Sequence, residues 1–395
     1  MLAGTWEPVD MSRRMREVIG ADKRLLERLA KRMLKLYPTP EGLSPSRLAG
    51  AIARDAGFRR KSSFRGTKIG RRFLVPDCMA ASRVPLTMAL PQLPTTGDLA
   101  GWLGLTHNQL DGHADLRGLH LSRPEFDDYR RWRQGTRWIE APKDRLRGVQ
   151  RKILREILEA VPVHDAAHGF CKGRGPRSHA ALHVGKHQVM RLDLRRFFPS
   201  IPRKRVRTIF GLVGYPARVS RVLAALCTTI SPVPGLYRQP HLPQGAPSSP
   251  RLANLVCFSL DVRLTALGNS WNATYTRYAD DLTFSGDRLP RISVVDNIVR
   301  EEGFKLNKAK TRVMGQGTRQ MVTGVVVNRH PAVPRAARKE LEAVLVNCIR
   351  QGWRSQNRKE HADFRAHLRG RIAQVHGVRP DHGTRLLTLY NQVEW

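Results

Sequence analysis

Residues 274–284 read TYTRYADDLTF, and in this stretch two adjacent carboxylates separate two short runs rich in Thr, Tyr and Phe. Runs of this composition favour β-strands, so the stretch predicts a hairpin with Asp280 and Asp281 at its tip. Two neighbouring carboxylates repel each other unless a cation lies beside them. Because carboxylate oxygens are ligands that Mg²⁺ prefers, the pair indicates a site for a divalent metal ion.

A third carboxylate stands in a matching context. Asp193 lies near the end of residues 187–194, an apolar stretch that we expect to be a strand. Acids from a strand end and a hairpin tip are suited to hold two metal ions about 4 Å apart, as in two-metal catalysis. The pair Asp127 and Asp128 has no strand on both sides, and we expect it to be a solvated surface.

Charge and composition narrow the class of protein. The 395 residues carry a formal net charge of +36, which makes nucleic acid the leading partner and an anionic membrane surface the second. No apolar run approaches the roughly 18 residues of a membrane-spanning helix, so we expect no integral membrane protein. The beginning of the chain shows no secretory signal, and the five cysteines are widely scattered, which fits a reducing cytoplasm.

The remaining pattern mixes helices and strands. A hairpin is expected over residues 129–142, with its turn at Gln134 and Gly135. Helices are expected over 13–37, 96–116 (a short pair), 143–161, 202–230, 253–267, 293–303 and much of the chain after 334, with a further strand over 320–328. Two basic features, the stretch 59–72 and the polar face of 143–161, are either solvated or in contact with nucleic acid.

Several segments together resemble the palm motifs of reverse transcriptases. These are Asp193 with Phe198, residues 242–250 (LPQGAPSSP) and residues 278–281 (YADD), and the likeness extends through 302–311 and covers about residues 129–395. The resemblance implies an α+β right-hand polymerase fold and the activity of an RNA-directed DNA polymerase, a nucleotidyltransferase. Fingers and palm with an antiparallel sheet would occupy 126–328, a basic helical thumb 329–395, and a mostly helical N-terminal extension 1–125.

Within that family the chain is most similar to the bacterial retron type. The similar segments are 168–170 (HGF), 173–175 (GRG), Ala180 with His183, and 322–324 (VTG); the family pattern has Asn where this chain has His179. The resemblance implies an enzyme that copies part of its own structured non-coding RNA into branched, RNA-linked DNA (msDNA). Its partners would be that RNA, the DNA product, dNTPs and an effector protein, with no membrane, in anti-phage defence in a bacterial cytoplasm.

The resemblance also assigns roles to single residues. Asp193, Asp280 and Asp281 would be catalytic and, with Leu194, would hold two Mg²⁺ ions, Mn²⁺ being the alternative. The nucleotide-binding residues would be Arg137, Phe198, Gln244, Gly245 and Lys310. The nucleic-acid contacts would be Arg174, His183, Arg338, Lys339 and Arg354. Phe198 would exclude a 2′-OH by its bulk, whereas Arg137 and Lys310 either meet the triphosphate or are solvated.

Alternatives stay open at this point. His164, His168 and Cys171 have the spacing of part of a zinc site but no obvious fourth ligand. Trp353 and Tyr390 either stack on bases or pack in a core. A different bacterial reverse transcriptase, of intron or untemplated type, is the nearest rival function. A non-catalytic RNA-bound scaffold that restrains an effector is the second rival, and the three acids argue against it.

Overall fold

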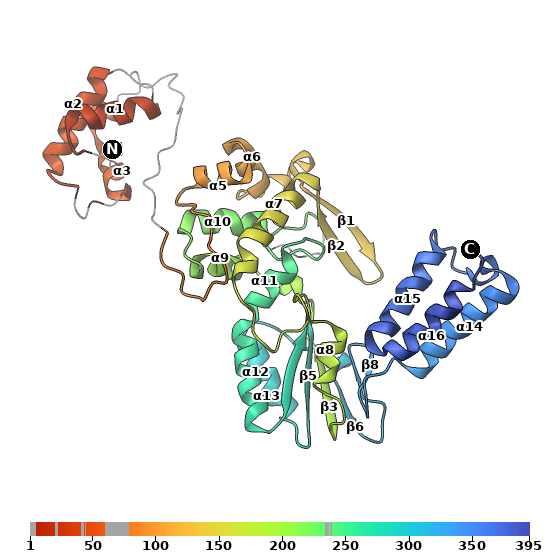
Figure 1. The fold of residues 1–395 in the computed structure, drawn as a ribbon. Coiled ribbons are helices and arrows are strands. Elements are labelled where there is room, and N and C mark those ends of the chain that lie inside the picture. Colours follow the sequence, from red (N-terminus) through yellow and green to blue (C-terminus); the bar gives the residue numbers. More distant parts are fainter. Residues whose placement is uncertain are drawn as a thin grey trace. The chain divides into compact units, whose positions relative to one another are not determined.

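The computed structural model describes residues 5–19, 23–40, 43, 45–59, 79–233, 237 and 239–395. The chain divides into two compact units, Met1–Met79 and Ala80–Trp395. The described part combines helices with antiparallel strands (Figure 1), which agrees with the expected α+β class. No helix within the described ranges is both long enough and apolar enough to cross a membrane.

The first unit is a small helical bundle. Its helices are α1 (Pro8–Ile19), α2 (Lys23–Leu36), α3 (Pro45–Arg54) and α4 (Ala56–Arg59). Met11 of α1 and Leu26, Leu29 and Met33 of α2 are buried in one core. The single helix expected over 13–37 is therefore wrong. The apolar residues of α1 and α2 face one core, and in sequence their spacing resembles the apolar face of a single helix. Beyond Arg59, the basic stretch 59–72 lies outside the described residues.

The second unit begins with helices and a hairpin. The helical pair α5 (Thr96–Leu103) and α6 (His107–Ala114) is confirmed, and each helix starts with a capping box, at Thr95 and Thr106. Strands β1 (Tyr129–Gln134) and β2 (Arg137–Pro142) form the expected hairpin. Helix α7 (Asp144–Glu156) ends before the expected boundary, and the chain continues as a 3-10 turn, Leu158–Ala160.

A four-stranded antiparallel sheet forms the centre of this unit. Its strands are β3 (Gln188–Asp193), β4 (Thr274–Tyr278), β5 (Asp281–Gly286) and β6 (Arg312–Gly315), in the order β4-β5-β3-β6. The register places Asp193 directly opposite Asp281. Leu192 and Leu282, the pair before them, are buried, so the apolar sequence of both strands fixes where the acids emerge.

Further helices belong to the same unit as this sheet. They are α8 (Pro176–Ala181), α9 (Arg203–Leu212), α10 (Ala217–Leu226), α11 (Ser249–Val256), α12 (Phe258–Ser270) and α13 (Ile292–Glu301). In Figure 1, α12 and α13 lie beside the strands on one side and α8 on the other. The helix expected over 253–267 is two helices, α11 and α12, which meet at Cys257.

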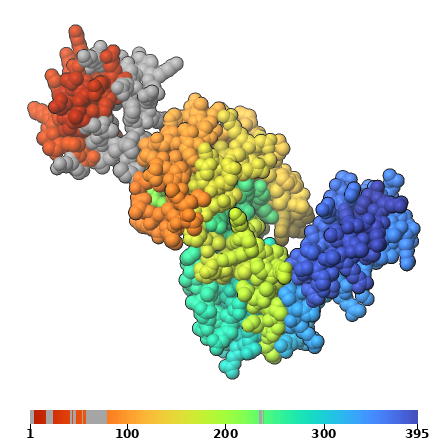
Figure 2. All heavy atoms as spheres, viewed as in Figure 1, coloured from red at the N-terminus to blue at the C-terminus, as the bar shows by residue number. Residues whose placement is uncertain are grey.

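The C-terminal part is a three-helix body. Helices α14 (Arg335–Gln351), α15 (Phe364–Val378) and α16 (Pro380–Asn391) pack on one core, and they form the blue to dark blue part of Figure 2. Tyr390 is buried in their core and its hydroxyl donates to the Arg365 carbonyl at 3.2 Å, so base stacking by Tyr390 is excluded.

The strand expected over 320–328 is instead a pair of two-residue strands, β7 (Met321–Val322) and β8 (Val325–Val326), because the backbone turns with positive φ at Thr323 and Gly324.

Candidate active site

The Tyr-Ala-Asp-Asp turn joins β4 to β5. Tyr278 and Asp281 close the hairpin, and Ala279 between them has a φ of +56°. For a residue with a Cβ this left-handed conformation costs about 1 kcal/mol. The turn is held at both carbonyls: Arg277 Nη1 donates to Ala279 at 3.0 Å, and the Leu194 N–H donates to Asp280 at 2.9 Å. The acids at the tip are thus fixed by the backbone on two sides.

A buried ion pair lies behind this turn. Arg277 donates from Nε and Nη2 to the two carboxylate oxygens of Asp261, at 2.8 and 2.6 Å, and both side chains are fully buried. Asn254 accepts from the same guanidinium at 2.9 Å. Breaking a buried pair of this kind costs about 3–5 kcal/mol. The pair was not predicted from the sequence, where a lone Arg inside a strand and a lone Asp inside an apolar helix were the available signals.

The segment around Gly169 packs directly on the turn. A Cβ at Gly169 would lie 2.5 Å from the Ala279 nitrogen, so no other residue fits without moving the turn. Asn254 Nδ2 donates to the Gly169 carbonyl at 2.8 Å. The His-Gly-Phe segment therefore supports the Tyr-Ala-Asp-Asp turn through its backbone.

The three predicted acids line one cavity. Asp193, Asp280 and Asp281 share a cavity of about 250 Å³ with three cationic side chains. Lys310 Nζ lies 2.8 Å from Asp193 Oδ2, and Arg191 Nη2 lies 3.3 Å from Asp281. Across the described residues, no three His, Cys, Asp or Glu side chains close around a common point. The acids lie beside cationic side chains in this cavity, and they are not arranged as a preformed metal site.

The surroundings of Asp280 disfavour the charged form of its carboxyl. Burial raises the pKa of its carboxyl, and the charges of Asp193 and Asp281 raise it further, whereas Arg137 lowers it. Burial also raises the pKa of Asp281, with Arg191 acting against it. A divalent cation would relieve this repulsion, and oxygen donors are the ligands that Mg²⁺ prefers. The donor set therefore fits a divalent ion.

A larger cavity of about 610 Å³ adjoins the acids. Four of the predicted nucleotide-binding residues line it: Arg137, Phe198, Gln244 and Lys310. Gly245 is not among the lining residues. Its φ of +129° is one that L side chains rarely adopt, and an added Cβ would lie only 3.0 Å from Ile139 Cγ2 and 3.2 Å from the Glu140 carbonyl oxygen. The hairpin, the strand β3 end and the loop at 242–250 thus converge on one space.

The role predicted for His183 as a nucleic-acid contact is wrong. The ring is fully buried, and its nitrogens hydrogen-bond with Ser285 Oγ and Thr276 Oγ1, both at 2.6 Å. Burial lowers the pKa of His183 to about 3, so the ring is neutral. A side chain enclosed in this way cannot reach a phosphate or a base.

His179, which departs from the retron pattern, is also fully buried. Its Nδ1 lies 3.0 Å from Thr323 Oγ1, so it joins two of the retron-like segments, and its ring lies beside that of Tyr278.

Arg174 donates to the carbonyls of Asp165 and Ala167, at 2.8 Å each, and holds its own loop. A nucleic-acid contact by Arg174 stays a prediction.

Two further sequence interpretations change. Asp127 pairs with Arg131, and Asp128 lies 2.7 Å from His113 Nδ1. The solvated surface expected there is wrong, because both acids are partly buried and each meets a side-chain partner. His164, His168 and Cys171 belong to no group of three metal-binding side chains within the described ranges. His168 instead hydrogen-bonds with Ser178 Oγ at 3.0 Å.

Cations on the C-terminal helices are available to a polyanion. Lys339 of α14 and Arg354 in the 3-10 turn Trp353–Gln356 are exposed, and Arg354 lies over the Trp353 ring. Arg338 is half-buried, 3.9 Å from Glu342. Contact with nucleic acid by these three residues stays a prediction.

Comparison with known proteins agrees with this arrangement. The family described as reverse transcriptase (RNA-dependent DNA polymerase) matches residues 127–327. The chain is 36% identical to the Retron Mx65 reverse transcriptase of Myxococcus xanthus, over 88% of this chain and 83% of that protein. It is 35% identical to the Retron Mx162 reverse transcriptase of the same organism, over 77% and 68%. It is 32% identical to the Retron Ec86 reverse transcriptase of Escherichia coli, over 65% and 77%.

Proposed function

This chain belongs to the retron-type reverse transcriptases and is an RNA-directed DNA polymerase, and on that premise we propose that it makes msDNA. It copies part of its own structured non-coding RNA and primes from a 2′-OH within that RNA, so that the product is a branched RNA–DNA molecule. The similarity to retron reverse transcriptases supports this product, and the shared cavity, in which Asp193 and Asp280 lie with Arg137 and Lys310, supports the polymerase chemistry.

In this proposal Asp193, Asp280, Asp281 and the Leu194 carbonyl hold two Mg²⁺ ions, with Mn²⁺ as the alternative. When bound, such ions lower the pKa of an attacking hydroxyl and stabilise the charge of a leaving pyrophosphate. The cation of Lys310 leaves Asp193 and approaches the pyrophosphate. Its side chain is 54% exposed, which gives it room to move.

The other walls of the larger cavity bind and select the nucleotide. The Arg137 guanidinium grips the triphosphate, a task that suits its planar set of donors. Gln244 and Gly245 bring backbone close to the incoming nucleotide, because Gly has no Cβ. The Phe198 ring stands where a 2′-OH would project and so favours deoxynucleotides.

The parts of the chain take the roles of a right-hand polymerase. Residues 126–328 form fingers and palm, 329–395 form the thumb, and 1–125 form an N-terminal extension. Arg174, Arg338, Lys339 and Arg354 contact the backbone of the RNA or of the hybrid, where each neutralised phosphate adds salt-dependent affinity. The enzyme works in a bacterial cytoplasm, in anti-phage defence together with an effector protein.

The proposal is tested by expressing the chain with its neighbouring non-coding RNA and sequencing the nucleic acid that co-purifies. A DNA of fixed length joined to RNA through a 2′,5′ branch is expected. An unbranched or untemplated product would show another kind of reverse transcriptase, and a complete lack of dNTP incorporation would point to a scaffold.

A further inference from the structure

The β1–β2 hairpin and the loop at 242–250, here called the Gln-Gly loop after Gln244 and Gly245, meet at Glu140. This residue lies on β2, three positions after Arg137, and only 1% of it is exposed. Its backbone N–H donates to the Gln244 carbonyl at 2.8 Å, and its own carbonyl lies against Gly245. The strand that presents Arg137 to the nucleotide cavity is therefore joined directly to the loop that presents Gln244.

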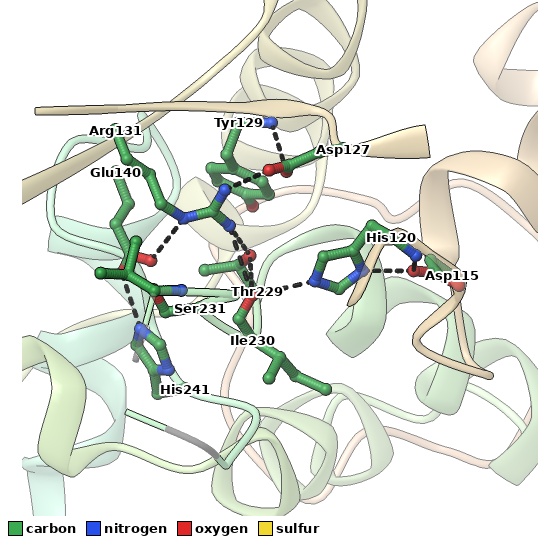
Figure 3. A network of polar contacts seen from close by, with 11 residues as sticks. Asp115, His120, Asp127, Tyr129, Arg131, Glu140, Thr229, Ile230, Ser231 and His241 are labelled. Atoms are coloured by element: carbon green, nitrogen blue, oxygen red, sulfur yellow. Dashed lines mark hydrogen bonds and ion pairs between the residues drawn. The ribbon is translucent and has the colours of Figure 1, made fainter. Parts of the chain in front are cut away.

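The Glu140 side chain makes a second junction between the same two parts. Its carboxylate accepts from Arg131 Nε at 3.1 Å and from His241 Nε2 at 2.7 Å, as Figure 3 shows. His241 Nδ1 lies 2.9 Å from the Gln239 carbonyl, so each ring nitrogen lies beside an oxygen atom of the surrounding structure. Burial alone would raise the pKa of Glu140, but the bonds and charges of His241 and Arg131 outweigh it and lower the pKa. The result is a buried, charged cluster.

The cluster is anchored on its other sides as well. Arg131 also pairs with Asp127 and donates to Thr229 Oγ1 at 3.0 Å. Thr229 and His241 exchange backbone hydrogen bonds of 3.0 and 2.9 Å. Since Leu242–Gly245 follow His241 directly, the position of the Gln-Gly loop is tied to the hairpin through side chains and backbone together.

We propose that Glu140 and His241 are positioning residues for the incoming nucleotide, which set the Gln244 backbone relative to Arg137. This inference rests on the proposed nucleotide role of the larger cavity, and neither residue lines that cavity. Buried polar groups are no better than packed apolar residues for stability alone, but their directional bonds fix one geometry. Misplacing a binding group by about 1 Å can cost up to about 100-fold in rate.

Two conservative variants test the proposal. Glu140→Gln keeps the size of the side chain but replaces one carboxylate oxygen by an NH₂ donor, which would face either Arg131 or His241 in place of an acceptor. His241→Gln replaces the ring, whose two nitrogens meet Glu140 and the Gln239 carbonyl, by an amide of different shape. The matched control is His113→Gln, because His113 makes a bond of the same 2.7 Å length to Asp128 but no bond to the hairpin–loop junction.

Steady-state kinetics on a fixed template–primer give the readout. Both test variants are expected to raise the KM for dNTP about tenfold, with kcat changed by less than about threefold and the KM for template–primer unchanged. The double variant should be no worse than Glu140→Gln, because both changes break the same junction. The control should keep the wild-type KM.

Three results would overturn the proposal: an unchanged KM for dNTP in both folded variants, an equal rise in His113→Gln, or a loss confined to kcat. Thermal unfolding of each protein is measured first, and if Glu140→Gln is unfolded at the assay temperature, His241→Gln decides. Failure of the nucleotide-pocket assignment itself looks different, because Arg137→Gln would then also leave the KM for dNTP unchanged.

Discussion

Asp280 and Asp281 are crowded against Asp193, and this crowding has a consequence for stability when no metal ion is bound. The pKa of both carboxyls is raised above the ordinary value of 3.8, so the folded state holds their protons more tightly than the unfolded state does. Their contribution to stability is complete below about pH 3.8 and is lost as the pH rises through the raised pKa.

Asp280→Asn is therefore expected to raise the melting temperature in EDTA at pH 7 by a few degrees, because the amide carries no charge. The gain should shrink as the pH falls toward 4. The control Asp287→Asn changes an exposed acid just beyond β5, at the opposite end of that strand from the turn, and should not alter the melting temperature. Calorimetry across this pH range is the measurement, and a lower melting temperature for Asp280→Asn would refute the electrostatic account.

Phe198 lines the larger cavity, and in the proposed function its ring excludes nucleotides that carry a 2′-OH. Phe198→Val should raise the ratio of kcat/KM for rNTP over dNTP by about 10- to 100-fold, as expected for a lost steric contact. The kcat/KM for dNTP serves as the internal control and should change much less. Single-nucleotide incorporation assays give both values, and an unchanged ratio would remove Phe198 from the sugar-facing wall.

Single residues differ in how far the sequence could predict them. Asp193 and Asp280 were predictable, because a carboxylate at the end of an apolar strand adds nothing to the packing of a core, and both line the cavity. The burial of His183 was not predictable. His183 lies in the turn after the short helix α8, and the spacing of residue types does not show which side of this segment packs on the sheet. The Arg277–Asp261 pair was missed because its partners lie on different elements, 16 positions apart.

At the scale of elements, the backbone of one segment supports another. Gly169→Ala should lower kcat by about 100-fold, because the new Cβ would push on Ala279 and shift the acids. Gly175→Ala is the matched control in the same segment, since nothing lies within 4 Å of its added Cβ, and it should keep wild-type activity. Equal activity of the two variants in a primer-extension assay would contradict this packing role.

Elements with strong periodicity were predicted well and those shaped by tertiary contacts were not. The hairpin at 129–142 and strand β3 follow directly from alternating and apolar runs. The break between α11 and α12 at Cys257 has no Pro or Gly to mark it, and the turn at 323–324 is marked by Gly324 alone. Two helices that share one core, α1 and α2, likewise look like one helix in sequence.

At the scale of the whole molecule, a net charge of +36 predicts strongly salt-dependent binding. Replacing Arg338, Lys339 and Arg354 together by Gln should reduce the log–log salt slope for a duplex by about 2–3, if each contacts a phosphate. A variant with Arg288 and Arg291 replaced by Gln is the control, because both are exposed beyond the end of β5 away from the acids. Binding isotherms at several salt concentrations measure the slopes. Equal slopes for the two variants would show that Arg338, Lys339 and Arg354 do not contact the nucleic-acid backbone.

The central claim is that acids from β3 and the β4–β5 turn act together on a divalent ion, and dNTP incorporation at increasing Mg²⁺ tests it most directly. Wild type and Asp287→Asn should show the same Mg²⁺-dependent synthesis on RNA, while Asp280→Asn should lose at least about 1,000-fold, since a metal ligand contributes several kcal/mol to the transition state. RNA binding should be retained in all three proteins. Mg²⁺-dependent synthesis by Asp280→Asn at the wild-type rate would contradict the account.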